Sequence, residues 1–282
     1  AFPLAKTGGL GDAITGMARA LMEARMPLSV LLPAYRGVRA KLNRVREVAT
    51  LEDLPGGPAV LLEGKCPQSG IDYLVLENDA LYDRGGLYAD ENGREHPDNG
   101  LRYAALAHAA VRVAAGLPGV ARPTLVHAHD WHAGLVPLLL RAAGLPDVKS
   151  VMTIHNLAFQ GLFPIACADE FGVPEWARTD DGAQAWGQLN FLKAGIRYAD
   201  RVTTVSHTYA REIMTPEFGC GLDALLRSRA DDLLPIPNGI DDVLWNPAHD
   251  PYLRSHRYSV RDLTNKIHCK AALQREFGLR SE

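Results

Sequence analysis

The sequence has few cysteines, no excess of charge and no long apolar run, and each shortage excludes a class of protein. Its four cysteines are widely scattered and form no Cys-x-x-Cys pair, so their spacing predicts neither a zinc site nor a dithiol redox motif. With 30 Lys and Arg against 33 Asp and Glu, the net charge of −3 argues against a nucleic-acid partner. No stretch approaches the roughly 18 apolar residues of a membrane-spanning helix. With no visible signal peptide, these features favour free thiols in a reducing cytoplasm.

What the chain does contain is a regular alternation of short apolar strands and longer helices. The expected strands cover 28–33, 58–63, 71–77, 124–128, 149–154 and 201–205. The expected helices cover 13–25, 101–115, 133–143, 185–199, 207–214 and 263–277. The strands from 124 onward lack in–out alternation, which is typical of strands buried on both faces. The pattern therefore predicts an α/β fold, a Rossmann-like parallel sheet with helices on both faces.

A glycine-rich loop precedes the first expected helix and runs from Lys6 to Asp12 as Lys-Thr-Gly-Gly-Leu-Gly-Asp. Glycines Gly8 and Gly9 let the backbone approach a ligand, and a helix N-terminus offers free N–H groups to an anion. Lys6 adds a mobile positive charge, and Asp12 is expected to cap the helix. The loop therefore suits a diphosphate. Its spacing matches neither common nucleotide-binding fingerprint, so a plain tight turn into the helix stays open as the alternative.

A second motif, His-Ala-His-Asp-Trp-His at 127–132, lies at the end of an expected strand. In an extended chain His127 and His129 point to one side and Asp130 to the other, which disfavours a shared metal. A carboxylate site at the carboxyl end of a parallel strand fits better, because open α/β sheets bind ligands there. A hydrogen-bonded core histidine remains the alternative for His127.

Two further strands are also followed by polar residues. His155 and Asn156 come directly after the strand at 149–154, and Ser206 follows the strand at 201–205. Because parallel strands end at one edge of a sheet, these residues are expected to join Asp130 at a common rim. Asn238-Gly239 is first of all a turn signal, and the long polar loop at 82–100 is of the kind that carries function.

Six motifs in one order carry a family resemblance. They are Lys-Thr-Gly-Gly-Leu-Gly-Asp, His-Ala-His-Asp-Trp-His, Thr-Ile-His-Asn-Leu-Ala-Phe-Gln-Gly, Phe-Leu-Lys-Ala-Gly, Ala-Asp-Arg-Val-Thr-Thr-Val-Ser and Pro-Asn-Gly-Ile-Asp. From Ala1 to about Leu279 the chain resembles bacterial glycogen synthases and starch synthases. The resemblance implies the N-terminal half of a GT-B fold. It also implies transfer of glucose from ADP-glucose to the non-reducing 4-OH of an α-1,4-glucan, with retention and with no metal or cofactor.

The resemblance assigns the first residues to the sugar nucleotide. Lys6 matches the lysine that binds the donor, and Gly8 and Gly9 match the loop that approaches its diphosphate and glucose. Asp12 matches the aspartate that closes this loop.

The resemblance places the remaining site residues around the transferred sugar. His155 matches the histidine beside the reacting carbon, and Asp130 matches a carboxylate near the sugar and acceptor. Asn156 and Asn238 match residues that line the donor site, and Tyr88 matches a tyrosine that stacks there.

The chain also departs from the family pattern at both ends. The family's first strand is expected before Ala1, and its second domain after Glu282, so 1–262 is expected to be the N-terminal, acceptor-side domain and 263–282 the start of the interdomain connection. The chain alone is therefore expected to be inactive. The alternatives are a GT-B transferase with another nucleotide-sugar donor, a non-catalytic glucan-binding remnant and, from the histidines, a metallo-hydrolase.

Overall fold

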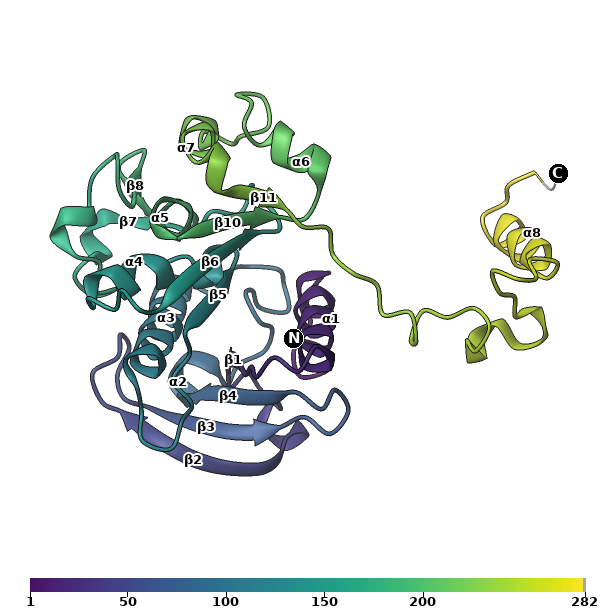
Figure 1. Ribbon diagram of the computed structural model, residues 1–282, viewed down its shortest axis with the longest axis horizontal. Helices are drawn as coiled ribbons and strands as arrows, with labels where there is room; N and C mark the ends of the chain where they lie inside the picture. The colour runs from purple at the N-terminus through teal and green to yellow at the C-terminus, as the bar shows by residue number, and fades with distance from the viewer. Residues whose placement is uncertain (281–282) are drawn as a thin grey trace. The chain divides into compact units, whose positions relative to one another are not determined.

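The structure is a computed structural model that describes residues 1–280. The chain divides into two compact units, residues 1–238 and 239–282. The domain boundary expected at residue 262 falls inside the second unit, and that expected division stays a prediction. The first unit contains two four-stranded sheets, a short three-stranded sheet and flanking helices (Figure 1).

The first sheet has the order β1-β4-β3-β2 and is mixed. Its strands are β1 (Val30–Pro33), β2 (Asn43–Leu51), β3 (Ala59–Lys65) and β4 (Asp72–Glu77). Only β1 and β4 pair in parallel, while β3 is antiparallel to both of its neighbours. The expectation of a parallel sheet is therefore wrong for this part of the chain. The reason is the short connection between β3 and β4, because a few residues can join antiparallel strands but not parallel ones.

The second sheet has the order β11-β10-β6-β5, and all of its pairings are parallel. Its strands are β5 (Leu125–His129), β6 (Lys149–Ile154), β10 (Arg201–Thr204) and β11 (Leu233–Pro235). Here the predicted parallel α/β arrangement is confirmed. Because all four strands run the same way, the residues that follow them gather along one edge of the sheet.

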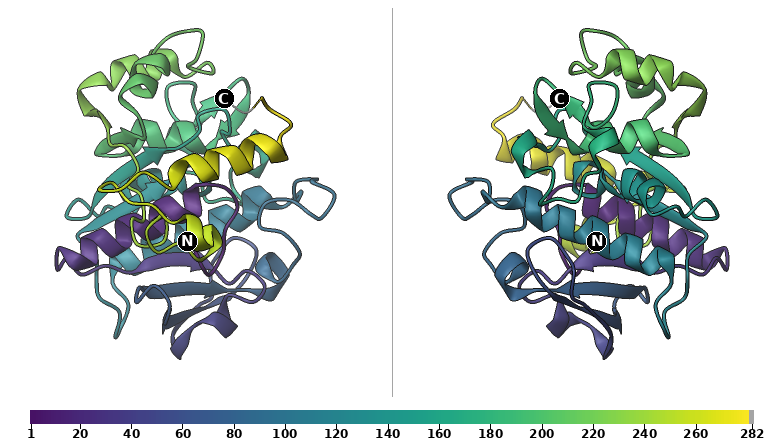
Figure 2. Two further views of the ribbon diagram at one scale, coloured as in Figure 1. Left: turned by 90° about the vertical axis from the view of Figure 1, so that its right-hand side faces the viewer. Right: turned by 90° about the vertical axis from the view of Figure 1, so that its left-hand side faces the viewer.

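The alanine-rich helix α3 (Asn99–Ala115) contributes to two hydrophobic cores. Ala104 and Ala107 belong to the core around the parallel sheet, whereas Ala105 and Ala109 belong to the core of the mixed sheet. Small side chains on both faces let the helix pack closely on each side, which explains its weak amphipathic pattern. The other helices of the first unit are α1 (Leu10–Glu23), α2 (Asp79–Tyr82), α4 (Val136–Ala142), α5 (Phe191–Tyr198), α6 (His207–Glu212) and α7 (Asp223–Ser228) (Figures 1 and 2).

The helix expected over 185–199 begins later, at Phe191. The residues before it form β8 (Gln184–Ala185) and β9 (Gln188–Asn190), which pair with β7 (Leu162–Pro164) in a small antiparallel sheet. Trp186 and Gly187 take positive φ angles of 52° and 75°, which make the turn between β8 and β9. Asn190 then starts α5, because its side chain accepts a hydrogen bond from the Lys193 N–H at 2.8 Å.

Short 3₁₀ helices complete the chain. They cover Arg39–Lys41, Trp131–Ala133, Ile165–Cys167, Glu175–Ala177, Ala230–Asp232 and Pro251–His256. The second unit contains the last of these and α8 (Lys266–Glu276), which buries none of its residues. No helix among residues 1–280 has the length and apolar character that crossing a bilayer requires.

Candidate functional site

Asp130, His155 and Asn156 meet at the carboxyl edge of the parallel sheet. The Asp130 carboxylate accepts a hydrogen bond from the backbone N–H of His155 at 2.8 Å and a longer one from that of Asn156 at 3.4 Å. Asp130 has a φ of 53°, and its own N–H donates to the Thr153 carbonyl at 2.9 Å. This positive φ, combined with a ψ of −174°, ends β5 and directs the carboxylate towards the residues that follow β6. The sequence prediction that these residues share one edge is confirmed.

Burial raises the pKa of the Asp130 carboxyl to about 6, while the two backbone hydrogen bonds act in the opposite direction. The group is 8% exposed, so water solvates its charge poorly. At neutral pH the carboxylate is ionised, and the two backbone N–H groups stabilise its charge in place of water. Because water screens this buried charge poorly, the carboxylate can attract and stabilise a positive charge on a nearby ligand.

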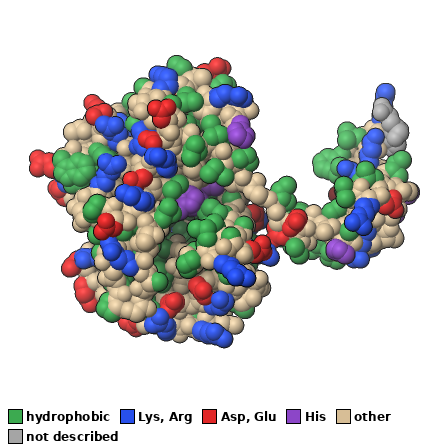
Figure 3. All heavy atoms as spheres, viewed as in Figure 1, with side chains coloured by type: hydrophobic (Ala, Val, Ile, Leu, Met, Phe, Trp, Pro, Cys, Tyr) green, Lys and Arg blue, Asp and Glu red, His purple; other side chains and the backbone are tan. Residues whose placement is uncertain are grey.

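Three histidines surround this edge, and they are neutral at neutral pH. Burial lowers the pKa of His127 and of His155 to about 4, and it holds the pKa of His129 well below its usual range. The rings of His127 and His129 are stacked with centroids 4.2 Å apart, as expected for residues on one side of a strand. Figure 3 shows histidine side chains recessed in a hollow of the face in view.

The three histidines and Asp130 do not form a metal site. His127 Nε2 lies 2.6 Å from Thr153 Oγ1, and His129 Nδ1 lies 3.1 Å from His155 Nε2, so these nitrogens are engaged in hydrogen bonds. Within residues 1–280, no three His, Cys, Asp or Glu side chains converge in an arrangement that could hold a metal ion. The hydrogen-bonded role that the sequence left open for His127 agrees with this geometry.

The third strand end, after β10, serves a structural role. The Ser206 side chain accepts a hydrogen bond from the Tyr209 N–H at 3.3 Å and starts α6. Tyr209 in turn accepts a hydrogen bond at its hydroxyl from the Leu157 N–H at 2.9 Å. The residues after β10 therefore support the segment that carries His155 and Asn156.

Tyr88 reaches the site by stacking on His132, at a centroid distance of 4.3 Å. Its position is held by Asn99, whose side-chain amide donates to the Tyr88 carbonyl at 2.9 Å, and Asn99 accepts a 2.7 Å hydrogen bond from the buried Arg102. Burial raises the pKa of the Tyr88 hydroxyl, and the Asp130 charge adds to this rise because the two groups are close.

Asn99, Arg102 and His132 were not predicted as site residues. His132 lies in the motif that the sequence analysis quoted, but its role depends on a contact with Tyr88, 44 positions earlier. The available signal in the sequence was a polar pair three positions apart, Asn99 and Arg102, at the start of an alanine-rich helix, and the structure buries both residues.

The glycine-rich loop lies at the start of α1. Helix α1 begins at Leu10 and is preceded by Gly9, which has φ −72° and no side chain to cap the first turn. The expectation that Asp12 caps the helix is wrong, because Asp12 lies inside the first turn and pairs with Lys6 at 2.8 Å. The first N–H groups of a helix have no partner within the helix. The N-terminus of α1 and Lys6 therefore remain suited to an anion.

The two glycines differ in what the fold requires of them. Gly8 has φ +68°, which disfavours any side chain, whereas Gly9 has an ordinary helical φ. A Cβ atom at Gly9 meets nothing within 4 Å. Nothing in the fold therefore requires glycine at position 9, and a ligand that approaches the backbone supplies a reason for it.

The structure does not bring every expected residue together. Within residues 1–280, no hydrogen bond or ion pair joins the Lys6–Asp12 pair to Asp130, His155 or Asn156. Asn238 is exposed and follows β11, at the end of the first unit. Its assignment to a donor site stays a prediction.

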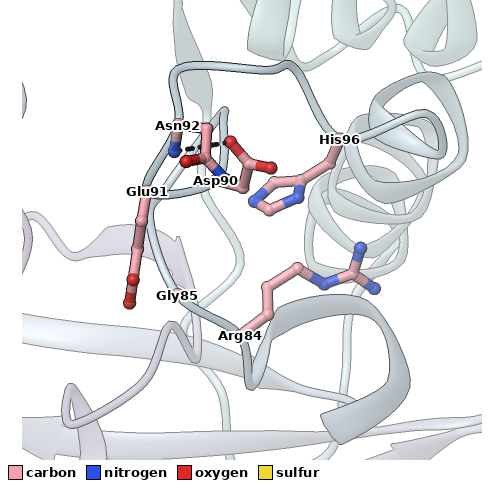
Figure 4. Close-up of a pocket in the computed structure, with 6 residues that line it drawn as sticks. All are labelled: Arg84, Gly85, Asp90, Glu91, Asn92 and His96. Carbon is pink, nitrogen blue, oxygen red and sulfur yellow. Dashed lines mark hydrogen bonds between the residues drawn. The ribbon is translucent and has the colours of Figure 1, made fainter.

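A surface pocket of about 470 Å³ lies in the long loop between α2 and α3 (Figure 4). Its lining residues are Arg84, Gly85, Asp90, Glu91, Asn92 and His96. Asp90 Oδ1 accepts hydrogen bonds from the N–H groups of Asn92 and Arg94, so this carboxylate folds the loop on itself. None of the residues predicted for the site lines this pocket. Its geometry explains the shape of the loop that carries Tyr88, and we assign it no ligand.

Comparison with known proteins shows which family the chain resembles in sequence. The profile of the family described as "Starch synthase catalytic domain" matches residues 1–228. The glycogen synthase of Bordetella petrii is 62% identical over 279 residues, covering 99% of this chain and 54% of its own length. The glycogen synthase of Ralstonia nicotianae is 50% identical over 275 residues, and this match covers 97% of this chain and 50% of the length of that protein. The chain therefore spans about half the length of these relatives.

A solved structure has the same fold. The catalytic domain of Starch Synthase IV from Arabidopsis thaliana, bound to ADP and acarbose, superposes with a TM-score of 0.82. The sequences are 28% identical, and the match covers 99% of this chain and 58% of that one.

Proposed function

Because this chain belongs to the starch synthase catalytic domain family, we propose that it supplies the acceptor-side half of a glycogen synthase. The reaction is transfer of glucose from ADP-glucose to the non-reducing 4-OH of an α-1,4-glucan, with retention at the anomeric carbon. One observation carries the proposal: Asp130 and His155 are joined at the carboxyl edge of the parallel sheet. Relatives named glycogen synthase, and a like fold solved with ADP and acarbose, support it.

The charge distribution at this edge suits the proposed reaction. As the bond from the glucose C1 atom to the diphosphate breaks, positive charge develops at the sugar ring. The buried Asp130 carboxylate stabilises that charge, and the neutral imidazole of His155 contacts the sugar without repelling it. A protonated histidine at the same place would oppose the developing charge.

The leaving diphosphate is assigned to the glycine-rich loop. Lys6 and the N-terminus of α1 offer positive charge and N–H donors to the phosphate oxygens as negative charge grows on them. Gly8 and Gly9 let the backbone come close to the donor. Asp12 neutralises Lys6 in the free protein and is released when phosphate takes its place. Asn156 and Asn238 complete the donor side, and Tyr88 lines the sugar site.

The proposal needs no metal and no cofactor, and its substrates are ADP-glucose and glucan. We place the protein in the cytoplasm, and its four cysteines, all of them free thiols, agree with a reducing compartment. Because relatives are about twice as long, we also propose that this chain alone does not turn over and that the rest of the fold completes the donor site.

The test is a comparison of two proteins. One is the 282-residue chain, and the other is a chimera in which this chain replaces the matched 279 residues of the Bordetella petrii glycogen synthase. We expect the chimera to transfer glucose from labelled ADP-glucose to glycogen, and the chain alone to be inactive. A chimera that folds but shows no transfer contradicts the proposed function, whereas robust turnover by the chain alone contradicts only its inactivity.

The same assay separates the alternatives. UDP-glucose in place of ADP-glucose tests the choice of nucleotide. Binding of maltooligosaccharide to an inactive chimera identifies a glucan-binding protein without catalysis.

A further inference from the structure

His129 and His155 contact each other through ring nitrogens. His129 is the last residue of β5 and lies opposite Thr153 of β6 in the parallel pairing. His155 follows Thr153 by two positions, so its side chain lies on the same face of the sheet. His129 Nδ1 is 3.1 Å from His155 Nε2, within hydrogen-bond range.

A hydrogen bond between two imidazole nitrogens fixes where the protons lie. One nitrogen must carry a hydrogen and the other must offer a lone pair. Two protonated rings cannot both satisfy this contact, because two N–H groups would face each other. Because Nε2 of His155 is occupied by His129, only Nδ1 of His155 is left to form a hydrogen bond with a ligand.

His129 is itself held in place from its other side. Its ring stacks on that of His127, whose Nε2 is 2.6 Å from Thr153 Oγ1. Thr153 Oγ1 is in turn 2.6 Å from Thr203 Oγ1, so side-chain hydrogen bonds connect the adjacent strands β5, β6 and β10. The His129 ring therefore cannot turn without breaking the contacts that surround it.

Burial and the neighbouring basic groups favour the neutral form of His129. Burial is the largest cause of its lowered pKa, followed by His127, His155 and the amino group of Ala1. The Asp130 carboxylate is next in sequence, but it accepts its hydrogen bonds from the backbone of His155 and Asn156. A neutral His129 can donate or accept one hydrogen bond at Nδ1, as the contact requires.

We propose that His129 is a positioning residue that locks the His155 imidazole in one tautomer and one orientation, so that only Nδ1 of His155 meets the sugar. This inference rests on the proposed function, because that function brings the sugar to His155. The backbone of His155 is fixed by Asp130 and its ring by His129. The two contacts together leave the ring little freedom before a substrate arrives.

The first test is nuclear magnetic resonance of the 282-residue chain labelled with ¹⁵N-histidine at pH 7. Long-range ¹H–¹⁵N spectra distinguish a protonated ring nitrogen from a bare one. We expect one neutral tautomer for His155, with one nitrogen of each kind. In His129→Phe, which keeps an aromatic ring but loses the nitrogen, both resonances should move towards the average of two exchanging tautomers.

Two further variants separate positioning from general packing. His129→Asn carries an amide that can take the place of Nδ1, and it should restore the single tautomer. His127→Phe keeps a ring that can stack on His129 and loses only the hydrogen bond to Thr153, so it should leave the single tautomer of His155 unchanged. A single tautomer that persists in His129→Phe overturns the inference, as does a loss of the single tautomer in His127→Phe. The signals of His108, whose ring nitrogen lies 3.0 Å from the Phe171 carbonyl oxygen, report that each variant is folded.

The second test is kinetic and uses the chimera. We expect His129→Phe to lower kcat about tenfold while KM for ADP-glucose stays nearly constant, and His129→Asn to recover most of the loss. An unchanged kcat in His129→Phe overturns the positioning role. An inactive parent chimera contradicts the proposed function instead, and the tautomer measured on the 282-residue chain still decides whether His129 orients His155.

Discussion

The Asp130 carboxylate accepts a hydrogen bond from the backbone N–H of His155 at 2.8 Å, although the two residues lie 25 positions apart in the sequence. The bond joins the residues that follow two adjacent parallel strands, β5 and β6. It therefore places a buried negative charge beside a neutral imidazole and defines the candidate site. Several consequences of this arrangement can be measured.

Asp130→Asn should stabilise the fold and abolish most of the activity. Because the folded pKa of Asp130 is raised, the folded protein binds an extra proton between about pH 4 and 6, and its stability falls as pH rises through that range. Asparagine does not titrate. The variant should therefore be more stable than the parent by about 3 kcal/mol at pH 8, with the difference falling below about 1 kcal/mol near pH 4.

Urea denaturation of the 282-residue chain across this pH range measures the difference. In the chimera, the same substitution should lower kcat by about a hundredfold. A stability difference that does not depend on pH contradicts the raised pKa, and full activity contradicts the catalytic role of the carboxylate.

His127→Gln should make the chain less sensitive to acid. The folded pKa of His127 is lowered to about 4, so the unfolded chain takes up the proton first and the folded state loses stability as pH falls below about 6.5. The parent should lose about 2 kcal/mol more than the variant between pH 7 and 5. His207→Gln, at an exposed position, is the matched control and should behave like the parent. Equal acid sensitivity of the parent and His127→Gln would count against a buried neutral His127.

Gly8→Ala and Gly9→Ala should have different effects. Alanine at position 8 must adopt φ +68° and should destabilise the chain by roughly 1–2 kcal/mol. Alanine at position 9 fits an open, helical position and should leave stability unchanged, yet it should raise the KM for ADP-glucose in the chimera. Thermal unfolding and donor titration measure the two effects. An unchanged donor KM in Gly9→Ala means that no ligand approaches this backbone.

Lys6→Ala should weaken donor binding about tenfold in the chimera, because it removes a charged hydrogen-bond donor to phosphate. Lys65→Ala is a closely matched control. Lys65 is 43% exposed and pairs with Asp72, whereas Lys6 is 44% exposed and pairs with Asp12. Both exposed ion pairs should contribute less than about 1 kcal/mol to stability. Equal donor affinities in the two variants would remove Lys6 from the phosphate site.

All six predicted strands are present in the structure, because each is a short apolar run bounded by polar or turn residues. The strand β2 was missed because most of its residues are exposed, so it shows no clear alternation. The helix predicted over 185–199 was drawn too long, because the turn at Trp186-Gly187 interrupts it. The local sequence pattern therefore identified the buried strands. It failed for the exposed strand β2 and for the turn at Trp186-Gly187, which depend on pairing with other strands.

The sequence by itself determined the α/β class, the parallel strands that end at Asp130 and His155, and the glycine-rich start of the first helix. These follow from local periodicity and from the rule that parallel strands end at one edge. Only the tertiary structure decided that the Asp130 carboxylate is buried, that His129 and His155 share a hydrogen bond, and that Tyr88 stacks on His132. Burial and contact between distant residues depend on packing, which no local pattern specifies.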